Sequence, residues 1–210
     1  PCLNVSEAHQ LISSLLADAT SKDAPADVPE TSPHIPAVPR GVNQEPVVEL
    51  TDVTFAYPHG GASVSNLNMC VYPGELVGII GQNGAGKTTL TKLLNGLLHP
   101  ASGTVRMAGM NTADVPTSAI AAKCATLFQN PDRQLCRDTV LDEVAFGLEL
   151  HGVGTDEARQ RARVAAERFG LPLDESPFSL SRGQRQMVAL ASVVVLDPQV
   201  VLLDEPTSGL

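Results

Sequence analysis

The sequence predicts an α/β fold in which a mixed β-sheet with flanking helices carries an antiparallel β edge and a helical subdomain. Three observations predict it: short apolar runs typical of buried strands, amphipathic helical spacing between those runs, and a glycine-rich loop joining one run to one helix. An apolar content of 43% with 18% charged residues suffices for a buried core. The expected strands are Val47–Tyr57 at a sheet edge, Leu76–Ile80, Cys124–Phe128 and Val200–Leu203.

The intervening segments predict four helices. Gly86–Leu98 has leucines at helical spacing, and we expect them to point inward: Leu90, Leu93, Leu94, Leu97 and Leu98. The segment Thr139–Leu196 is mostly helical in pattern, and Thr155 is the expected N-cap of its second helix. The three helices expected there are Val140–Leu150, Thr155–Phe169 and Ser181–Leu196.

Composition limits the class of partner. The chain has 14 Lys and Arg against 23 Asp and Glu, a formal charge of −9, which argues against nucleic-acid binding because that requires clustered cations. The longest apolar run, Met187–Leu196, is too short to span a bilayer.

No secretory leader pattern is present, and the four cysteines form no C-x-x-C pair, so we expect reduced thiols in a cytoplasmic protein. These cysteines are Cys2, Cys70, Cys124 and Cys136.

The N-terminal residues differ from the rest of the chain. Residues 1–20 contain an amphipathic helical pattern at Asn4–Ala17, and residues 21–45 read as an extended linker, since Pro25–Pro46 carries six prolines. A lone helix of this length is marginal in water. The helix could be an N-terminal extension of the domain that follows, but we expect it to be the tail of a preceding domain. Because the chain starts at Pro1 and stops at Leu210 within a motif, we expect a fragment of a longer protein.

The glycine-rich loop carries the strongest motif. Residues 81–89 match G-x-x-x-x-G-K-[ST], follow an expected strand and open an expected helix, as in P-loop nucleoside triphosphatases. Glycines allow the backbone to direct its N–H groups at phosphate oxygens, and the helix N-terminus favours the same anion. Lys87 would reach the β- and γ-phosphates, and the Thr88 hydroxyl would bind Mg²⁺. The predicted nucleotide-binding residues are Gly81, Gln82, Asn83, Gly84, Ala85, Gly86, Lys87, Thr88 and Thr89.

Two carboxylates follow the last expected strand. Asp204 and Glu205 end the apolar run Val200–Leu203, and ligand sites collect at such strand ends. Alone, these acids would read as a solvated strand end. Coupled to the phosphate loop, Asp204 is predicted to bind Mg²⁺, and Glu205 to polarise the water that attacks the γ-phosphate.

A third motif indicates the family. Leu180–Gln186 precedes a helix with Ser181 as its expected N-cap, and Asp204–Leu210 follows soon after. Together they resemble the signature motif and Walker B motif of ATP-binding-cassette (ABC) ATPases, and the resemblance covers Pro46–Leu210. It implies ATP and Mg²⁺ as ligands and a second cassette as partner, in the same chain or another subunit. The partner's ATP would be contacted by Ser181, Gly183 and Gln184.

The resemblance assigns further residues. Gln129 matches the Q-loop glutamine, implying a catalytic role and a Mg²⁺ contact, and Tyr57 occupies the position at which the family stacks an aromatic ring on adenine. Arg182 departs from the usual signature glycine. The family's next aspartate and its switch histidine would follow Leu210, so we expect these residues alone to be inactive in hydrolysis.

One segment narrows the resemblance to a particular group of ABC ATPases. Gln129–Leu135, followed by Thr139–Val140 and Asp142–Gly147, resembles the ATPases of energy-coupling-factor importers, which take up vitamins and cobalt or nickel ions. This implies that Gln129–Leu135 faces a membrane scaffold subunit, with the protein peripheral on the inner face of the cell membrane. Residues 1–20 would then end a preceding cassette, and residues 46–210 would form a second cassette truncated at its C-terminus.

Two other classes remain open. A soluble ABC ATPase acting on nucleic acid or ribosomes would predict coiled-coil heptads or basic insertions, and neither is found. A small-molecule P-loop kinase would make the signature match accidental, against the run Asp204–Thr207. Co-purification of a membrane protein would favour the importer. The transported solute cannot be read from the sequence, because such an ATPase does not touch it.

Overall fold

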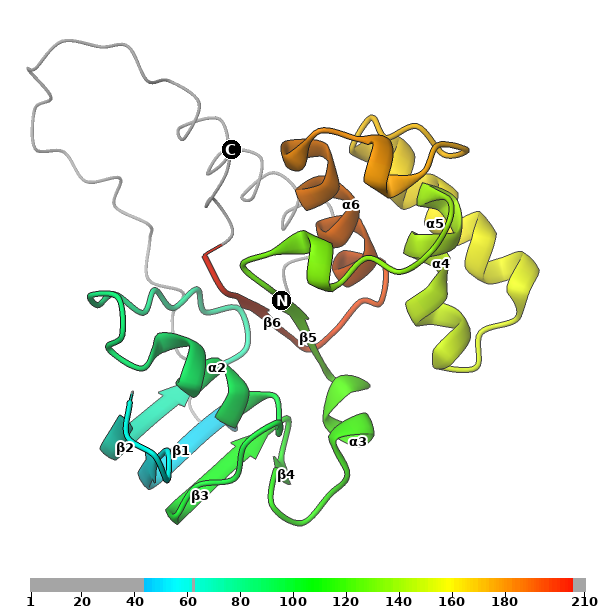
Figure 1. The fold of residues 1–210 in the computed structure, drawn as a ribbon. Coiled ribbons are helices and arrows are strands. Elements are labelled where there is room, and N and C mark those ends of the chain that lie inside the picture. The colour runs from blue at the N-terminus through cyan, green and yellow to red at the C-terminus, as the bar shows by residue number, and fades with distance from the viewer. Residues whose placement is uncertain (1–43, 62, 206–210) are drawn as a thin grey trace, which may run out of the picture.

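The computed structural model describes residues 44–61 and 63–205 (Figure 1). The predicted N-terminal helix, nearly all of the linker, Cys2 and residues 206–210 lie outside the described residues. The strands are β1 (Val48–Ala56), β2 (Ser63–Val71), β3 (Ser102–Met107), β4 (Met110–Asn111), β5 (Cys124–Leu127) and β6 (Val200–Leu203). The helices are α2 (Lys87–Leu94), α3 (Thr117–Ala121), α4 (Val140–Leu150), α5 (Thr155–Arg168) and α6 (Arg182–Val194), with 3₁₀ turns η1 (Pro131–Arg133) and η2 (Pro177–Ser179).

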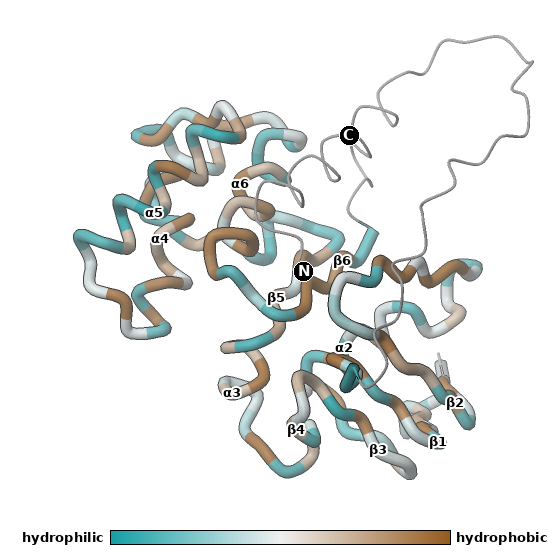
Figure 2. Tube along the Cα trace, turned by 180° about the vertical axis from the view of Figure 1, so that it is seen from behind, coloured by the Kyte–Doolittle hydropathy of each residue, from teal (hydrophilic) through white to brown (hydrophobic). Residues whose placement is uncertain are grey.

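These elements form two parts joined by a parallel pair of strands. The antiparallel sheet, in the order β2-β1-β3-β4, packs with α2 at one end of the molecule, and α4, α5 and α6 gather at the other (Figure 1). Strands β5 and β6 run between them, and β6 is drawn as an apolar stretch in Figure 2. The mixed α/β fold expected from the sequence is confirmed.

Strand β1 lies inside the sheet, so its predicted place at an edge is wrong. Val48 pairs with Val71 of β2 on one side and with Met107 of β3 on the other. Val48 and Val53 are buried, because neighbouring strands and α2 cover β1. Strand β2 supplies one of these neighbours, and its polar sequence gave no strand prediction.

The predicted strand Leu76–Ile80 is not observed. Residues 75–80 form neither helix nor strand, and Ile80 is 98% exposed. A strand requires hydrogen bonds to a neighbouring strand. Within the part of the chain that the structure describes, no strand pairs with this segment, so its apolar sequence alone does not make it one.

The predicted helices form, with corrections at their ends. The Val140–Leu150 prediction is confirmed, and Ser181 caps α6 as expected. The N-cap of α5 is Gly154, not Thr155, which is already helical. Helix α2 ends at Leu94, because the chain turns at Gly96 with φ +73°, and Leu97 is consequently exposed rather than inward.

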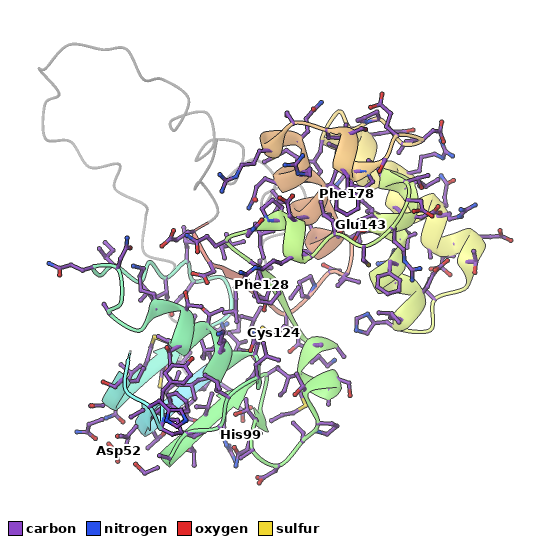
Figure 3. All side chains as sticks on the ribbon, in the orientation of Figure 1. Asp52, His99, Cys124, Phe128, Glu143 and Phe178 are labelled. Atoms are coloured by element: carbon purple, nitrogen blue, oxygen red, sulfur yellow. The ribbon has the colours of Figure 1, made fainter. Side chains whose placement is uncertain are left out.

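Two hydrophobic cores meet at β5. Cys124 belongs to the core of the sheet and α2, whereas Ala125 and Leu127 belong to the core of α4, α5 and α6. Burial raises the pKa of the Cys124 thiol to about 12, so it stays neutral and behaves as a small apolar group. Figure 3 shows Cys124 and Phe128 along this junction. Among residues 44–61 and 63–205, no helix is both long and apolar enough to cross a membrane.

Candidate nucleotide-binding site

The glycine-rich loop leads directly into α2. Gly86 is the N-cap residue of that helix, with φ +93°, a conformation that side-chain-bearing residues rarely adopt. A Cβ at Gly86 would lie 3.1 Å from the carbonyl oxygen of Ser63 on β2. No side chain caps α2, so its first N–H groups remain directed out of the helix as donors for an anion.

The Lys87 side chain folds back over this loop. Its Nζ donates to the carbonyl oxygens of Gly81 at 2.8 Å and Gln82 at 3.2 Å. These bonds hold a positive charge beside the outward-facing N–H groups. A compact cation and several backbone donors at one place are the chemical requirements of a phosphate site.

The loop meets the end of β6 through Thr88. Its Oγ1 donates to Asp204 Oδ2 at 3.0 Å across 116 residues of sequence. Asp204 is buried, and its backbone N–H donates to the carbonyl oxygen of Leu127 on β5. A hydroxyl and a carboxylate are hard oxygen ligands of the kind Mg²⁺ prefers.

The register of the parallel strands explains a second contact. Leu127 of β5 pairs with Leu203 of β6, which places Gln129 and Glu205 two residues beyond the same rung of the ladder. Gln129 Nε2 donates to Glu205 Oε2 at 2.5 Å. Glu205 has φ +49°, an uncommon conformation for a non-glycine residue that often accompanies functional sites.

The donors near these strand ends fit a magnesium ion held with phosphate. Thr88, Gln129 and Asp204 offer a hydroxyl, an amide and a carboxylate. No cluster of three or more His, Cys, Asp or Glu among the described residues could hold a metal alone. Mg²⁺ bound through substrate phosphates uses only one or two protein carboxylates, so Asp204 with Thr88 and Gln129 is compatible with such an ion.

A groove of about 410 Å³ extends from the site. Lys87, Asp204 and Glu205 contribute to its lining, together with the chain around Leu76–Ile79 and the apolar side chains of β6. Polar groups therefore converge at one part of a mostly apolar groove.

The predicted signature residues lie at the start of α6, in a different part of the molecule from α2 (Figure 1). Ser181 and Gln184 form a capping box: the Gln184 N–H donates to Ser181 Oγ at 3.2 Å, and the Ser181 N–H donates to Gln184 Oε1 at 3.0 Å. Gly183 lies within the first turn. The structure thus leaves these residues outside the loop site of their own chain.

Tyr57, predicted to contact adenine, follows β1 and is half-buried. Its ring packs edge-on against Phe55, with 5.0 Å between ring centroids and an interplanar angle of 89°. Edge-to-face packing of this kind fixes a ring in one orientation. Contact with adenine stays a prediction.

Sequence reasoning overlooked the buried carboxylate of Glu143, which holds the chain that follows η1. Its buried carboxylate on α4 accepts hydrogen bonds from the backbone N–H groups of Cys136 and Arg137, each at 2.7 Å, and Figure 3 shows Glu143 among the helices. The Arg137 guanidinium also lies 3.7 Å from the centroid of the Phe146 ring. An acidic residue on the buried face of a helix, between Val140 and Val144, was the available signal.

Comparison with known proteins agrees with this geometry. Residues 64–208 match the ABC transporter family model. A putative ABC transporter ATP-binding protein of Methanosarcina mazei is 43% identical over 169 residues, covering 80% of this chain and 34% of the relative. The energy-coupling factor transporter ATP-binding protein EcfA1 of Lacticaseibacillus paracasei is 43% identical over 167 residues, covering 78% of this chain and 60% of the relative. The chain thus spans between about a third and three fifths of these curated relatives.

Two solved structures share the fold. CbiO1 of Clostridium perfringens, described as part of the ABC transporter complex CbiONQ, has a TM-score of 0.69 at 32% identity, covering 80% of this chain and 68% of that one. A dimeric ATP-binding cassette in a post-hydrolysis state with ADP and phosphate has a TM-score of 0.68 at 29% identity, covering 78% and 75%. Each likeness covers about four fifths of this chain.

Proposed function

Since this chain belongs to the ABC transporter family, we propose that it binds ATP with Mg²⁺ and hydrolyses ATP to drive import of a small solute across a membrane. The observation that carries the proposal is the convergence of the phosphate loop with the ends of β5 and β6. There Thr88 contacts Asp204, and Gln129 contacts Glu205. The 43% identity to an energy-coupling factor transporter ATP-binding protein supports a role in energising a transporter. The vitamin or transition-metal ion proposed as solute rests on the resemblance of Gln129–Leu135 and the following residues to importer ATPases.

Each residue has a role that its contacts support. Lys87 would exchange its bonds to loop carbonyls for the β- and γ-phosphates, and the uncapped N–H groups of α2 would bind phosphate oxygens. Thr88 and Asp204 would hold Mg²⁺, which neutralises phosphate charge. Glu205, oriented by Gln129, would accept a proton from the attacking water.

The proposed transporter requires two further partners. A second cassette would bind the same ATP through Ser181, Gly183 and Gln184, which their own chain keeps apart from its loop. A membrane scaffold subunit would dock at Gln129–Leu135, named here the docking segment. The protein would then act at the cytoplasmic face of the membrane. Nucleotide binding would close the cassettes and move the docking segment against the scaffold.

ATP titration tests the nucleotide site. Lys87→Ala, in the protein expressed from its complete gene, should weaken ATP binding at least about tenfold, because it removes a charge-assisted contact to phosphate. Lys92→Ala is the matched control, since Lys92 lies in the last turn of the same helix, and it should leave ATP affinity unchanged. Unchanged affinity in Lys87→Ala would remove the loop as the site.

Hydrolysis tests the proposed base. Glu205→Gln should retain ATP binding while turnover falls by about a hundredfold or more, because an amide of nearly the same shape cannot accept the proton. ATP-dependent dimers should accumulate and be visible by size-exclusion chromatography. Turnover within a few-fold of the parent would exclude Glu205 as the base.

Partner capture tests the transport role. The tagged protein, purified from its native membrane in detergent, should retain a membrane-embedded subunit. Recovery with nucleic acid or ribosomes instead would support a soluble ABC ATPase and contradict the importer.

A further inference from the structure

One arginine of α6 connects the start of that helix with the docking segment. Arg185 Nη1 donates to the carbonyl oxygen of Leu180 at 2.6 Å, and its Nε lies 2.7 Å from Asp132 Oδ1 on η1. We propose that Arg185 is a positioning residue that transmits movement of the α6 start to the docking segment through these two simultaneous contacts. The inference rests on the proposed function and names the coupling residue within it.

Arg185 is suited to transmit movement because its rigid, planar guanidinium contacts both sides at once: Nη1 donates to the Leu180 carbonyl oxygen, and Nε forms an ion pair with Asp132. Its side chain is 21% exposed, so solvent and salt screen this ion pair less than a fully exposed one. Asp132 is itself held, since its backbone N–H donates to Asn130 Oδ1 at 3.0 Å within the η1 turn. Arg185 therefore joins the backbone at the start of α6, through Leu180, to the hydrogen-bonded η1 turn, through Asp132.

The two sides of the docking segment are attached to different elements. Before η1, Gln129 donates to Glu205 at the end of β6. After η1, the backbone at Cys136 and Arg137 is held by Glu143 of α4. Between these anchors, Asp132 is joined to α6. A displacement of the α6 start relative to β6 would therefore reach the docking segment between its two anchors, and Arg185 is the side chain that joins α6 to Asp132 there.

Hydrogen–deuterium exchange with and without a non-hydrolysable ATP analogue and Mg²⁺ tests the link. In the protein expressed from its complete gene, the analogue should alter exchange in peptides covering residues 180–187 and 130–136. Arg185→Met should keep the response at 180–187 and reduce the response at 130–136 by about fivefold. Asp132→Asn should reduce the same response, and Asp132→Glu, which keeps the carboxylate, should restore at least half of it.

The possible outcomes distinguish failure of the coupling role of Arg185 from failure of the proposed function. A full response at 130–136 in both Arg185→Met and Asp132→Asn overturns the coupling role while leaving the nucleotide site intact. Loss of response at both peptides in Arg185→Met, with ATP affinity unchanged, gives Arg185 a merely structural role in α6 and also overturns it. A parent protein that binds no analogue overturns the proposed function first. If circular dichroism shows that Arg185→Met does not fold, the responses of Asp132→Asn and Asp132→Glu at residues 130–136 test the coupling role instead.

Discussion

Two helices begin at residues that we assign to phosphate recognition, and their first turns are built in opposite ways. Helix α2 begins after Gly86, with a left-handed backbone and no side-chain cap. Helix α6 begins after Ser181, where Ser181 and Gln184 close a complete capping box. The first helix keeps its N–H donors for an anion, whereas the second satisfies its own donors within the chain.

This difference predicts an order of events. A phosphate can bind at the start of α2 without displacing a side-chain cap, and only Lys87 has to exchange its bonds to the loop carbonyls. At α6, Ser181 and Gln184 can contact a phosphate only by giving up bonds that stabilise the helix by about 1 kcal/mol. We therefore expect ATP to bind first at the loop, and the signature residues to engage it only when a second cassette supplies compensating contacts.

The largest expected effect comes from Gly86→Ala, which attacks the uncapped helix start. Its Cβ would meet the Ser63 carbonyl oxygen at 3.1 Å in a backbone conformation unfavourable to alanine, so unfolding free energy should fall by about 1–3 kcal/mol and ATP affinity should fall too. Gly152→Ala is the control, because Gly152 has φ +82° but no atom within 4 Å of its added Cβ. Equal losses in urea titrations of both variants would show that the contact with Ser63 contributes nothing.

Ser181→Ala addresses the capped helix and should have an intermediate effect. Removing the acceptor of the Gln184 N–H should cost about 1 kcal/mol, or about 2–4 °C in Tm for a domain of this size. Ser179→Ala is the control, since Ser179 Oγ donates only to the Ser176 carbonyl oxygen on an exposed turn. A Tm equal to the control's would mean that the box does not stabilise α6, and the contrast with α2 would fail.

The smallest expected effect concerns the start of α4, where the capping residue Thr139 contacts the charged side chain of Asp142. Thr139 caps α4, and hydrogen bonds from Arg159 and then Thr139 lower the pKa of Asp142 below its ordinary value of 3.8. A lowered folded-state pKa stabilises the fold at neutral pH, and this contribution is lost as pH falls through 3.8 toward the folded-state pKa. Asp142→Asn should thus lower Tm slightly at pH 7, with the difference from the parent shrinking near pH 3. A pH-independent difference would contradict this.

Local patterns predicted much of the fold and most of the candidate site. The helix Val140–Leu150 is predicted from its helical pattern, which lies within a short stretch of chain, and the structure adds Thr139 as its cap. The phosphate loop is similarly local. The contact of Thr88 with Asp204, and that of Gln129 with Glu205, could be anticipated because apolar runs ending in polar residues indicate neighbouring strand ends.

The errors arise where distant parts of the chain decide the outcome. Strand β2 pairs with β1 between Val48 and Ala56 with two register shifts, and its adjacent exposed residues Ser65 and Asn66 interrupt the period-two pattern. The run Leu76–Ile80 has a strand's composition, but pairing depends on a neighbour that local sequence cannot specify. The hydrogen bonds of Glu143 could not be predicted from the sequence, because its partners at Cys136 and Arg137 are backbone N–H groups, which every residue type except proline supplies.

The segment Leu76–Ile80 has a consequence for handling the protein. It exposes Leu76, Val77, Ile79 and Ile80 near β6, where Val201 is also partly exposed. Adjacent exposed apolar side chains on a segment that forms neither helix nor strand favour association with another polypeptide. We expect the described residues, produced alone, to self-associate at high concentration, with light scattering that rises in kosmotropic salt and falls when Ile80 is replaced by lysine.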